Sequence, residues 1–122
     1  MIDNKIIVIS TDKSFVSDIT HNYTNDMIKS INKIDFWDTS NEIYFMNCNK
    51  FIILTETLNI IDNWILIIKR LCVKSNVLLV YKNLKYEDVL FKIRKLNGGT
   101  VNILWCHYNN VLNKIPLLFS KK

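Results

Sequence analysis

The chain has 122 residues, of which 49% are hydrophobic and 22% charged. This length and composition suit one domain over residues 1–122 with a core that buries roughly two-thirds of the unfolded surface, and they exclude both a second domain and a disordered chain. The 16 Lys and Arg exceed the 11 Asp and Glu by five, but no segment is the dense basic run typical of nucleic-acid binding, so direct DNA contact is not expected.

The first strand is predicted over residues 5–10. The apolar run Ile6-Ile7-Val8-Ile9 stops at Ser10-Thr11-Asp12. This change is typical of a buried parallel strand that is followed by polar residues at the carboxyl edge of the sheet. An apolar stripe then predicts a helix from Lys13 to about Ile31, with Asp12 or Ser14 as its cap. The stripe recurs at every fourth position and consists of Phe15, Ile19, Tyr23, Met27 and Ile31.

The middle of the chain alternates between strand and helix patterns. Residues 33–39 alternate apolar and acidic side chains and predict a more exposed strand, followed by a short helical turn over 41–49. Residues 50–57, "KFIILTET", carry four successive apolar residues and predict a central strand. A helix over 60–73 is predicted from one apolar face, formed by Ile61, Trp64, Ile65, Ile68 and Cys72.

The last third repeats this alternation. Residues 76–82 predict a buried strand, and 86–97 predict an amphipathic helix that ends in Lys and Arg before Gly98-Gly99. These glycines follow a helix and lack phosphate-loop spacing, so they predict a turn. Residues 100–107 predict a last strand, and a short helix or arm follows. Strand and helix therefore alternate about five times, which predicts a parallel sheet with helices on both sides.

The cysteines and the chain ends point to a cytoplasmic protein. Cys48, Cys72 and Cys106 have neither CxxC nor zinc-site spacing, so we expect reduced thiols and no metal. The start "MIDNK" lacks the apolar region of a signal peptide, and no apolar run is long enough to span a membrane. Cys106 and His107 are neighbours on a predicted strand and point to opposite faces, so they do not form a catalytic dyad.

The order, spacing and length of these elements resemble the receiver domain of bacterial two-component response regulators over essentially the whole chain. The resemblance implies a flavodoxin-like (βα)5 three-layer sandwich with a parallel five-stranded sheet. It also implies where the phosphorylation residues should lie. Ser10-Thr11 stand where receivers carry an acidic pair, Thr55 stands at the phosphate-accepting aspartate, and Tyr81 replaces a small hydroxyl residue. The segment "LWCHY" offers no clear lysine at the end of the fifth strand.

The chemistry of phosphorylation fails at these positions. An aspartyl phosphate needs a carboxylate nucleophile and a divalent cation held by clustered oxygens, which Thr55 and a lone Asp12 do not supply. Glu56 points to the opposite face from Thr55 on a regular strand. The site made of Ser10, Thr11, Asp12, Thr55 and Tyr81 is therefore interpreted as a degenerate phosphorylation site, in a domain that is not an enzyme and needs no cofactor.

The pattern is similar to the N-terminal degenerate receivers of atypical LuxR-type transcription regulators. The resemblance implies a phosphorylation-independent regulatory domain that forms a homodimer through about residues 86–119 and positions a DNA-binding domain or a protein partner. The predicted surface consists of Phe91, Trp105, Val111, Leu112, Ile115, Leu118 and Phe119. The alternative is a stand-alone adaptor or inhibitor that binds a protein partner as a monomer through its Trp- and Ile-rich surface.

Overall fold

A computed structural model describes residues 6–10, 12–22, 28–31, 46–72 and 74–119. The strands are β1 (Ile6–Ile9), β2 (Ile28–Ile31), β3 (Lys50–Thr55), β4 (Ser75–Tyr81) and β5 (Val101–His107). The helices are α1 (Lys13–Asn22), α3 (Leu58–Leu71), α4 (Tyr86–Leu96) and α5 (Val111–Lys114), and the short 3-10 helices η3 (Tyr108–Asn110) and η4 (Ile115–Phe119) flank α5. Among these helices, none is long and apolar enough to cross a membrane.

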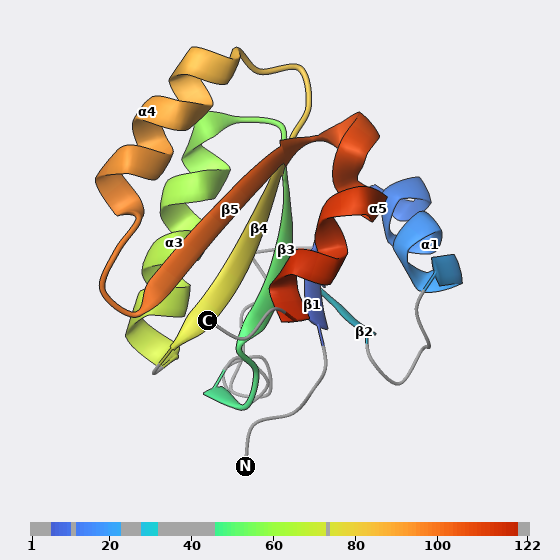
Figure 1. The fold of residues 1–122 in the computed structure, drawn as a ribbon, viewed down its shortest axis with the longest axis horizontal. Coiled ribbons are helices and arrows are strands. Elements are labelled where there is room, and N and C mark those ends of the chain that lie inside the picture. The colour runs from blue at the N-terminus through green and yellow to red at the C-terminus, as the bar shows by residue number, and fades with distance from the viewer. Residues whose placement is uncertain (1–5, 11, 23–27, 32–45, 73, 120–122) are drawn as a thin grey trace.

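The strands form one parallel sheet in the order β2-β1-β3-β4-β5 (Figure 1). Side chains are described for β1, β3, β4 and β5, and the backbone of β2 pairs with β1 at the edge of the sheet. This order is compatible with a flavodoxin-like doubly wound fold, in which ligands bind outside the carboxyl ends of the strands. The α/β class and the parallel sheet predicted from the alternation are therefore confirmed.

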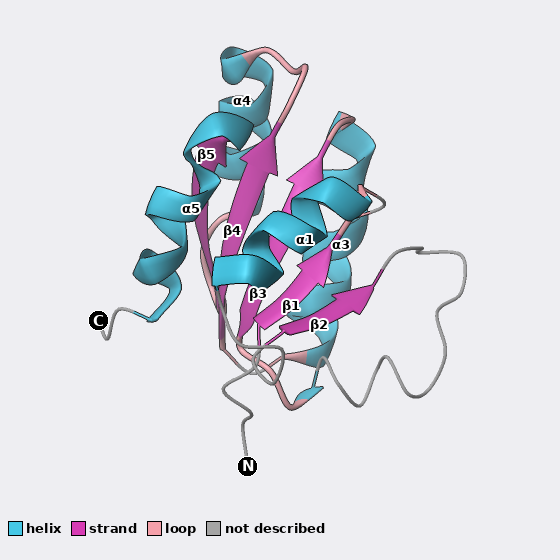
Figure 2. Ribbon diagram, turned by 90° about the vertical axis from the view of Figure 1, so that its right-hand side faces the viewer, coloured by secondary structure: helices cyan, strands magenta, loops and turns pink. Residues whose placement is uncertain are grey.

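The central strands are apolar on both sides because each side of the sheet is covered by helices. On one side, α3 and α4 pack through Ile61, Trp64, Ile65, Ile68, Val89 and Ile93. On the other side, α1 and α5 pack through Phe15, Ile19 and Val111. Figure 2 shows α1 and α5 in front of the sheet and α3 and α4 behind it. Alternate residues of β3 follow this division, with Phe51 and Ile53 facing α3 and Ile52 and Leu54 facing α1.

The turn between α4 and β5 follows from its glycines and from Asn97. Gly98 and Gly99 have φ values of +122° and +63°, which side chains rarely adopt. The Asn97 side-chain oxygen accepts a hydrogen bond of 3.0 Å from the Ile103 backbone N–H, at the outer edge of β5. The predicted helix stop and turn at residues 97–99 are thus confirmed, and the side chain of Asn97 covers part of an open sheet edge.

The first predicted helix is wrong at its C-terminal end, where residues 28–31 form a strand, and residues 23–27 lie outside the described residues. It begins at Lys13 as expected but ends at Asn22, and residues 28–31 pair in register with β1 instead of continuing the apolar stripe. The spacing of every fourth residue predicted a helix here, but Ile28 and Ile31 also suit a strand. Pairing with β1 satisfies the hydrogen-bonding groups of the backbone, and side-chain periodicity carries no information about that pairing. The strand expected over 33–39 and most of the turn expected over 41–49 lie outside the described residues.

Candidate functional site

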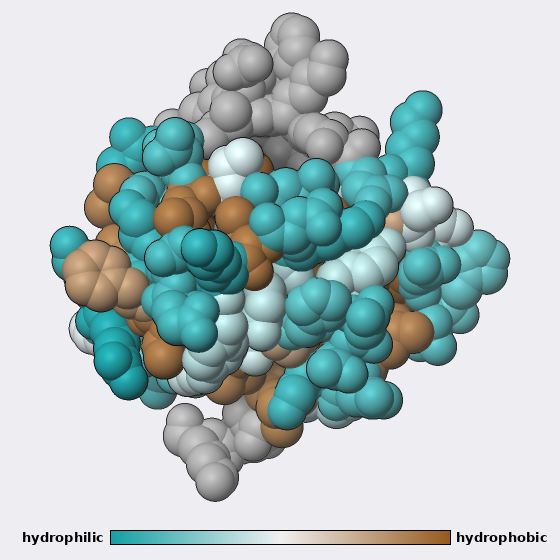
Figure 3. Space-filling model, turned by 90° about the horizontal axis from the view of Figure 1, so that it is seen from above, coloured by the Kyte–Doolittle hydropathy of each residue, from teal (hydrophilic) through white to brown (hydrophobic). Residues whose placement is uncertain are grey.

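The polar residues that follow the strands meet at the carboxyl edge of the sheet. Thr55, Tyr81 and His107 end β3, β4 and β5 and are register partners across the three strands. Ser10 and Asp12 follow β1 at the same edge. Seen from above in Figure 3, this face is mostly hydrophilic. The prediction that these residues gather at one edge is confirmed for those described, and the side chain of Thr11 lies outside the described residues.

Asp12 caps helix α1. Its Oδ1 accepts hydrogen bonds from the backbone N–H groups of Ser14 and Phe15, at 2.9 and 3.2 Å. The hydroxyl of Ser10, which is 6% exposed, accepts a further bond of 2.9 Å from the Asp12 N–H. The capping role expected for Asp12 is therefore confirmed. A carboxylate that serves as a helix cap gains from the helix dipole in that position, and its oxygen is occupied by backbone donors.

Thr55 is sealed inside the protein at the position of the expected phosphate acceptor. It has no exposed surface, and its Oγ1 makes no hydrogen bond with any described residue. Its backbone oxygen accepts from the Lys82 N–H at 3.2 Å, which joins the ends of β3 and β4. A buried hydroxyl without a base beside it has neither the charge nor the access needed to attack phosphate.

Aromatic rings cover the end of β4. The ring of Tyr81 lies 5.5 Å from that of His107 in an edge-on arrangement and 6.3 Å from that of Tyr86. Desolvation raises the pKa of Tyr81, and Tyr86 and Cys106 add to the increase. Lys82 places its Nζ 4.6 Å from the centre of the Tyr108 ring. The cation nearest to this edge of β4 therefore contacts an aromatic ring instead of a cluster of carboxylates.

The three cysteines are buried, and burial makes the thiols of Cys72 and Cys106 weakly acidic. Burial raises the pKa of Cys106 to about 11, although Lys114 lowers it somewhat, and burial together with Cys48 raises the pKa of Cys72 to about 12. Thiols with such values are poor nucleophiles near neutral pH. Cys106 belongs to the core beneath α1 and α5, whereas the ring of His107 contacts Tyr81 on the other side, so the expected separation of this pair is confirmed. The described residues contain no cluster of metal ligands.

The residues expected at a partner surface fall into two groups. Val111, Ile115 and Leu118 are at most 8% exposed and pack in the core with α1, so in the monomer they are not part of an exposed surface. Their spacing places them on one face of α5 and η4, which covers the sheet. Phe91 and Leu112, by contrast, are 59% and 41% exposed.

Trp105 and Phe119 complete the set of residues expected at the partner surface. Trp105 on the edge strand β5 is half-buried, and the side chain of Phe119 lies outside the described residues. Leu117, after Pro116, is 46% exposed and was not predicted as a surface residue. The sequence could have predicted this exposure, because Leu117 does not share the helical spacing of the buried residues Val111, Ile115 and Leu118. Leu66 on α3 is 58% exposed.

A groove of about 250 Å³ lies between α1 and the segment that connects β5 to α5. Phe15, Tyr108 and Val111 contribute apolar walls, and Asp18 and Leu112 also line the groove. The rings of Phe15 and Tyr108 are 5.6 Å apart. Sequence reasoning did not find this groove, because its walls come from helices about 90 residues apart in the chain.

Comparisons of the chain with protein-family models, with curated proteins and with solved structures found no match.

Proposed function

We propose that this chain is a degenerate receiver domain of (βα)5, flavodoxin-like architecture that acts in the cytoplasm without phosphorylation, as the non-enzymatic regulatory and dimerisation domain of a bacterial LuxR-type transcription regulator. The observation that carries the proposal is the complete burial of Thr55 at the end of β3. A buried hydroxyl at the acceptor position cannot accept phosphate, so a signalling domain of this kind would change state by association, tuned by a ligand or a protein, instead of by phosphorylation.

The state of Asp12 supports the same conclusion. Phosphorylation needs several oxygens free to hold a divalent cation beside the acceptor. Oδ1 of Asp12 accepts hydrogen bonds from the first turn of α1, and the hydroxyl of Ser10 accepts one from the Asp12 backbone N–H. Both residues thus stabilise the loop after β1, so the loop keeps its shape without a bound cation.

The proposed dimer surface lies around β5 and its flanking helices. Phe91 on α4 and Leu112 and Leu117 near the C-terminal end are exposed apolar side chains. Burying such side chains against a second copy would contribute about 1.5–3 kcal/mol for each one that is fully covered. In this mechanism the dimer forms by mass action and positions whatever is linked to or bound by each copy.

Sedimentation velocity over a wide concentration range, with and without magnesium and beryllofluoride, tests the proposal. We expect a concentration-dependent dimer whose dissociation constant is the same in both buffers, because Thr55 offers no carboxylate to the phosphate mimic. A dimer that forms only with the mimic would mean that phosphate chemistry survives in this domain.

Matched variants locate the surface. Phe91→Asp and Leu112→Asp should weaken the dimer by at least tenfold, since each places a charge in an apolar contact. Leu66→Asp is the control, because Leu66 is as exposed as Phe91 but lies on α3, outside residues 86–119. Equal weakening by all three substitutions would contradict the assignment to β5 and its neighbours.

The groove between α1 and α5 favours a second candidate, a monomeric adaptor that binds a protein partner. Its walls combine apolar rings with the carboxylate of Asp18, and Leu112 stands at its rim. A monomer at every concentration, whose partner in a pull-down is lost with Leu112→Asp, would favour this adaptor over the dimer.

A further inference from the structure

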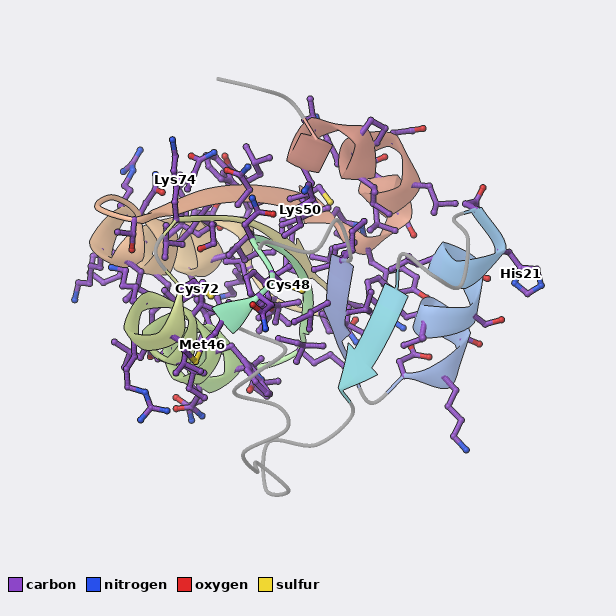
Figure 4. All side chains as sticks on the ribbon, turned by 90° about the horizontal axis from the view of Figure 1, so that it is seen from below. His21, Met46, Cys48, Lys50, Cys72 and Lys74 are labelled. Atoms are coloured by element: carbon purple, nitrogen blue, oxygen red, sulfur yellow. The ribbon has the colours of Figure 1, made fainter. Side chains whose placement is uncertain are left out.

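The outer edge of β5 is a side of the sheet on which no strand of the described chain lies. β5 and β2 are the outermost strands in the sheet order. Figure 4 looks onto the amino ends of the strands, the amino edge of the sheet, where Lys50 begins β3 and Lys74 precedes β4, and β5 runs along the outside of β4. Every residue from 74 to 118 is described, so the hydrogen-bond partners that the flanking segments give to β5 are defined.

Successive residues of β5 direct their backbone groups to opposite sides of the strand. The Ser75 N–H donates to the Thr100 carbonyl at 2.8 Å, which fixes Thr100 and every second residue after it on the side of β4. Val101 faces the other way, because it exchanges two hydrogen bonds with Gly98, at 3.1 and 3.2 Å. The same alternation directs the backbone N–H and C=O groups of three further residues outward, namely Ile103, Trp105 and His107.

The chain closes the first half of this outer edge and leaves the second half open. After the pairing of Val101 with Gly98, the Ile103 N–H donates to the side chain of Asn97 at 3.0 Å. Within the described part of the chain, no hydrogen bond reaches the outward N–H or C=O of Trp105, and none reaches the N–H of His107. Unpaired backbone groups in a strand conformation are the template on which another strand pairs. The open stretch therefore suits an extended peptide.

The side chains beside the open stretch are apolar and only partly covered. Trp105 packs on the side of the sheet that α3 and α4 cover, and Leu104 packs on the side of α1 and α5. Both side chains keep part of their surface in contact with solvent. An added strand alternates its own side chains between the same two sides of the sheet. We therefore expect a segment with apolar residues on both of its faces, which would cover Trp105 on one side and Leu104 on the other.

A second copy of this chain fits the open stretch less well than a separate segment does. Two β5 edges that pair antiparallel about a twofold axis can use only residues 104–107 of each copy. Asn97 covers Ile103 at one end of this stretch, and η3 begins at Tyr108 at the other end. An extended segment of another protein has no such folded neighbours, so it can lie between Asn97 and η3.

We propose that the outer edge of β5 binds an extended, apolar segment of a partner protein, which adds to the sheet as a further strand. This inference goes beyond the proposed dimer, because the partner is a different chain and backbone groups of Trp105 and His107 make the contacts. Main-chain hydrogen bonds would supply the affinity, and the surfaces of Leu104 and Trp105 would supply the preference for apolar side chains.

The experiment is amide hydrogen exchange measured by NMR, with and without a peptide of about seven residues that alternates Thr and Val between terminal Glu residues. In the free domain the amides of Trp105 and His107 should exchange fast, whereas those of Leu104 and Cys106, which face β4, should exchange slowly. The peptide at millimolar concentration should slow exchange at Trp105 and His107 by about tenfold once about nine-tenths of the domain is bound.

The matched control is the same peptide with every interior amide N-methylated. This analogue keeps the side chains but cannot donate hydrogen bonds to a strand, so it should leave exchange at Trp105 and His107 unchanged. Equal protection by both peptides would overturn the proposal, because side chains instead of backbone pairing would then hold the peptide. The proposal is also wrong if neither peptide slows these two amides at millimolar concentration.

Asn97→Ala and Asn102→Ala are a matched pair of variants. The first uncovers the Ile103 N–H and lengthens the open edge by one donor, so the peptide should bind about two- to tenfold more tightly. The second removes an exposed side chain from a residue whose backbone faces β4, and it should leave binding within about twofold. Thermal melting confirms that both variants are folded. Unchanged or weaker binding by folded Asn97→Ala would contradict the assignment to this edge.

Sedimentation of the same samples distinguishes a partner segment from a second copy. If Trp105 and His107 become protected without peptide as the protein concentration rises and a dimer forms, a second copy occupies the edge and the proposed partner segment is wrong. If a dimer forms while both amides stay exchangeable until the peptide is added, strand addition and dimerisation are separate properties and the proposal holds. A monomer whose amides are protected by the peptide supports strand addition and contradicts the proposed dimer.

Discussion

The two edges of the sheet differ in how their polar residues are used. At the carboxyl edge, where this type of fold places its ligands, Asp12 caps a helix and the hydroxyl of Thr55 is buried. At the amino edge, Lys74 and Arg94 face solvent. At the carboxyl edge, one polar residue therefore stabilises a helix and another is buried without a hydrogen-bond partner, whereas these two cations of the amino edge are exposed.

Thr55→Asp is the strongest test of the carboxyl edge. A carboxylate in this buried position should destabilise the domain by about 3 kcal/mol, because its charge would lose hydration without gaining a partner. Urea denaturation measures the loss. Thr57→Asp is the matched control, since Thr57 is the exposed N-cap of α3 and an acid there favours the helix. A stable Thr55→Asp variant that accepts phosphate from acetyl phosphate would show that the acceptor position still works.

Asp12→Ala tests whether Asp12 is a structural cap or a free acid. Loss of the bonds to Ser14 and Phe15 should cost about 1 kcal/mol of stability, whereas Asp12→Asn should cost only a few tenths, because the amide oxygen also caps helices. Chemical denaturation of the two variants gives the comparison. Equal stability of the alanine variant and the unmodified chain would contradict the capping role.

Thr55→Val removes the buried hydroxyl while keeping the shape of the side chain. We expect an increase in stability of about 1 kcal/mol, since an unpaired buried hydroxyl costs free energy and an apolar group of equal size does not. Thermal and urea denaturation should agree on the sign. A destabilised variant would mean that the hydroxyl has a partner.

Ionisation of the buried thiols should have a smaller effect on stability, which depends on pH and can be compared between the two edges. The pKa of Cys72, near the amino edge, is raised from 9.0 to about 12, so the folded state keeps its proton above pH 9 while the unfolded state loses it. Stability is therefore complete below pH 9 and falls as the pH rises toward 12. Between about pH 8 and 9.5 the unmodified chain should lose roughly 1 kcal/mol more stability in urea denaturation than Cys72→Ala.

Cys106, close to the carboxyl edge, provides the counterpart. Lys114 lowers its pKa somewhat against the effect of burial, giving about 11. Cys106→Ala should therefore change the same pH dependence by a similar amount near pH 9.5, and the two thiols should differ only above about pH 11. Equal pH dependence for the unmodified chain and both variants would mean that the thiols reach water in the folded state.

Local patterns predicted the interior of the molecule well. The runs around Ile53 and Leu79 predicted buried strands, and the face of Ile61, Trp64, Ile65 and Ile68 predicted α3, because apolar side chains at these periods have one way to leave water. Periodicity failed at Ile28–Ile31, where the same residues suit helix and strand and pairing with β1 decides. Ile115 and Leu118 were also expected at a partner surface, whereas they are buried. A short apolar segment can cover its own sheet or bind a partner, and its sequence does not distinguish the two.

The sequence by itself determined the alternation of strands and helices and the polar ends of the strands, since both depend on residue type and local spacing. Tertiary structure alone decided that Thr55 is sealed, that Ile28–Ile31 pair with β1 and that Val111, Ile115 and Leu118 cover their own sheet. The physical reason is that burial, hydrogen bonding and electrostatic potential depend on distances in space, and parallel crossovers bring together residues that the chain separates by tens of positions.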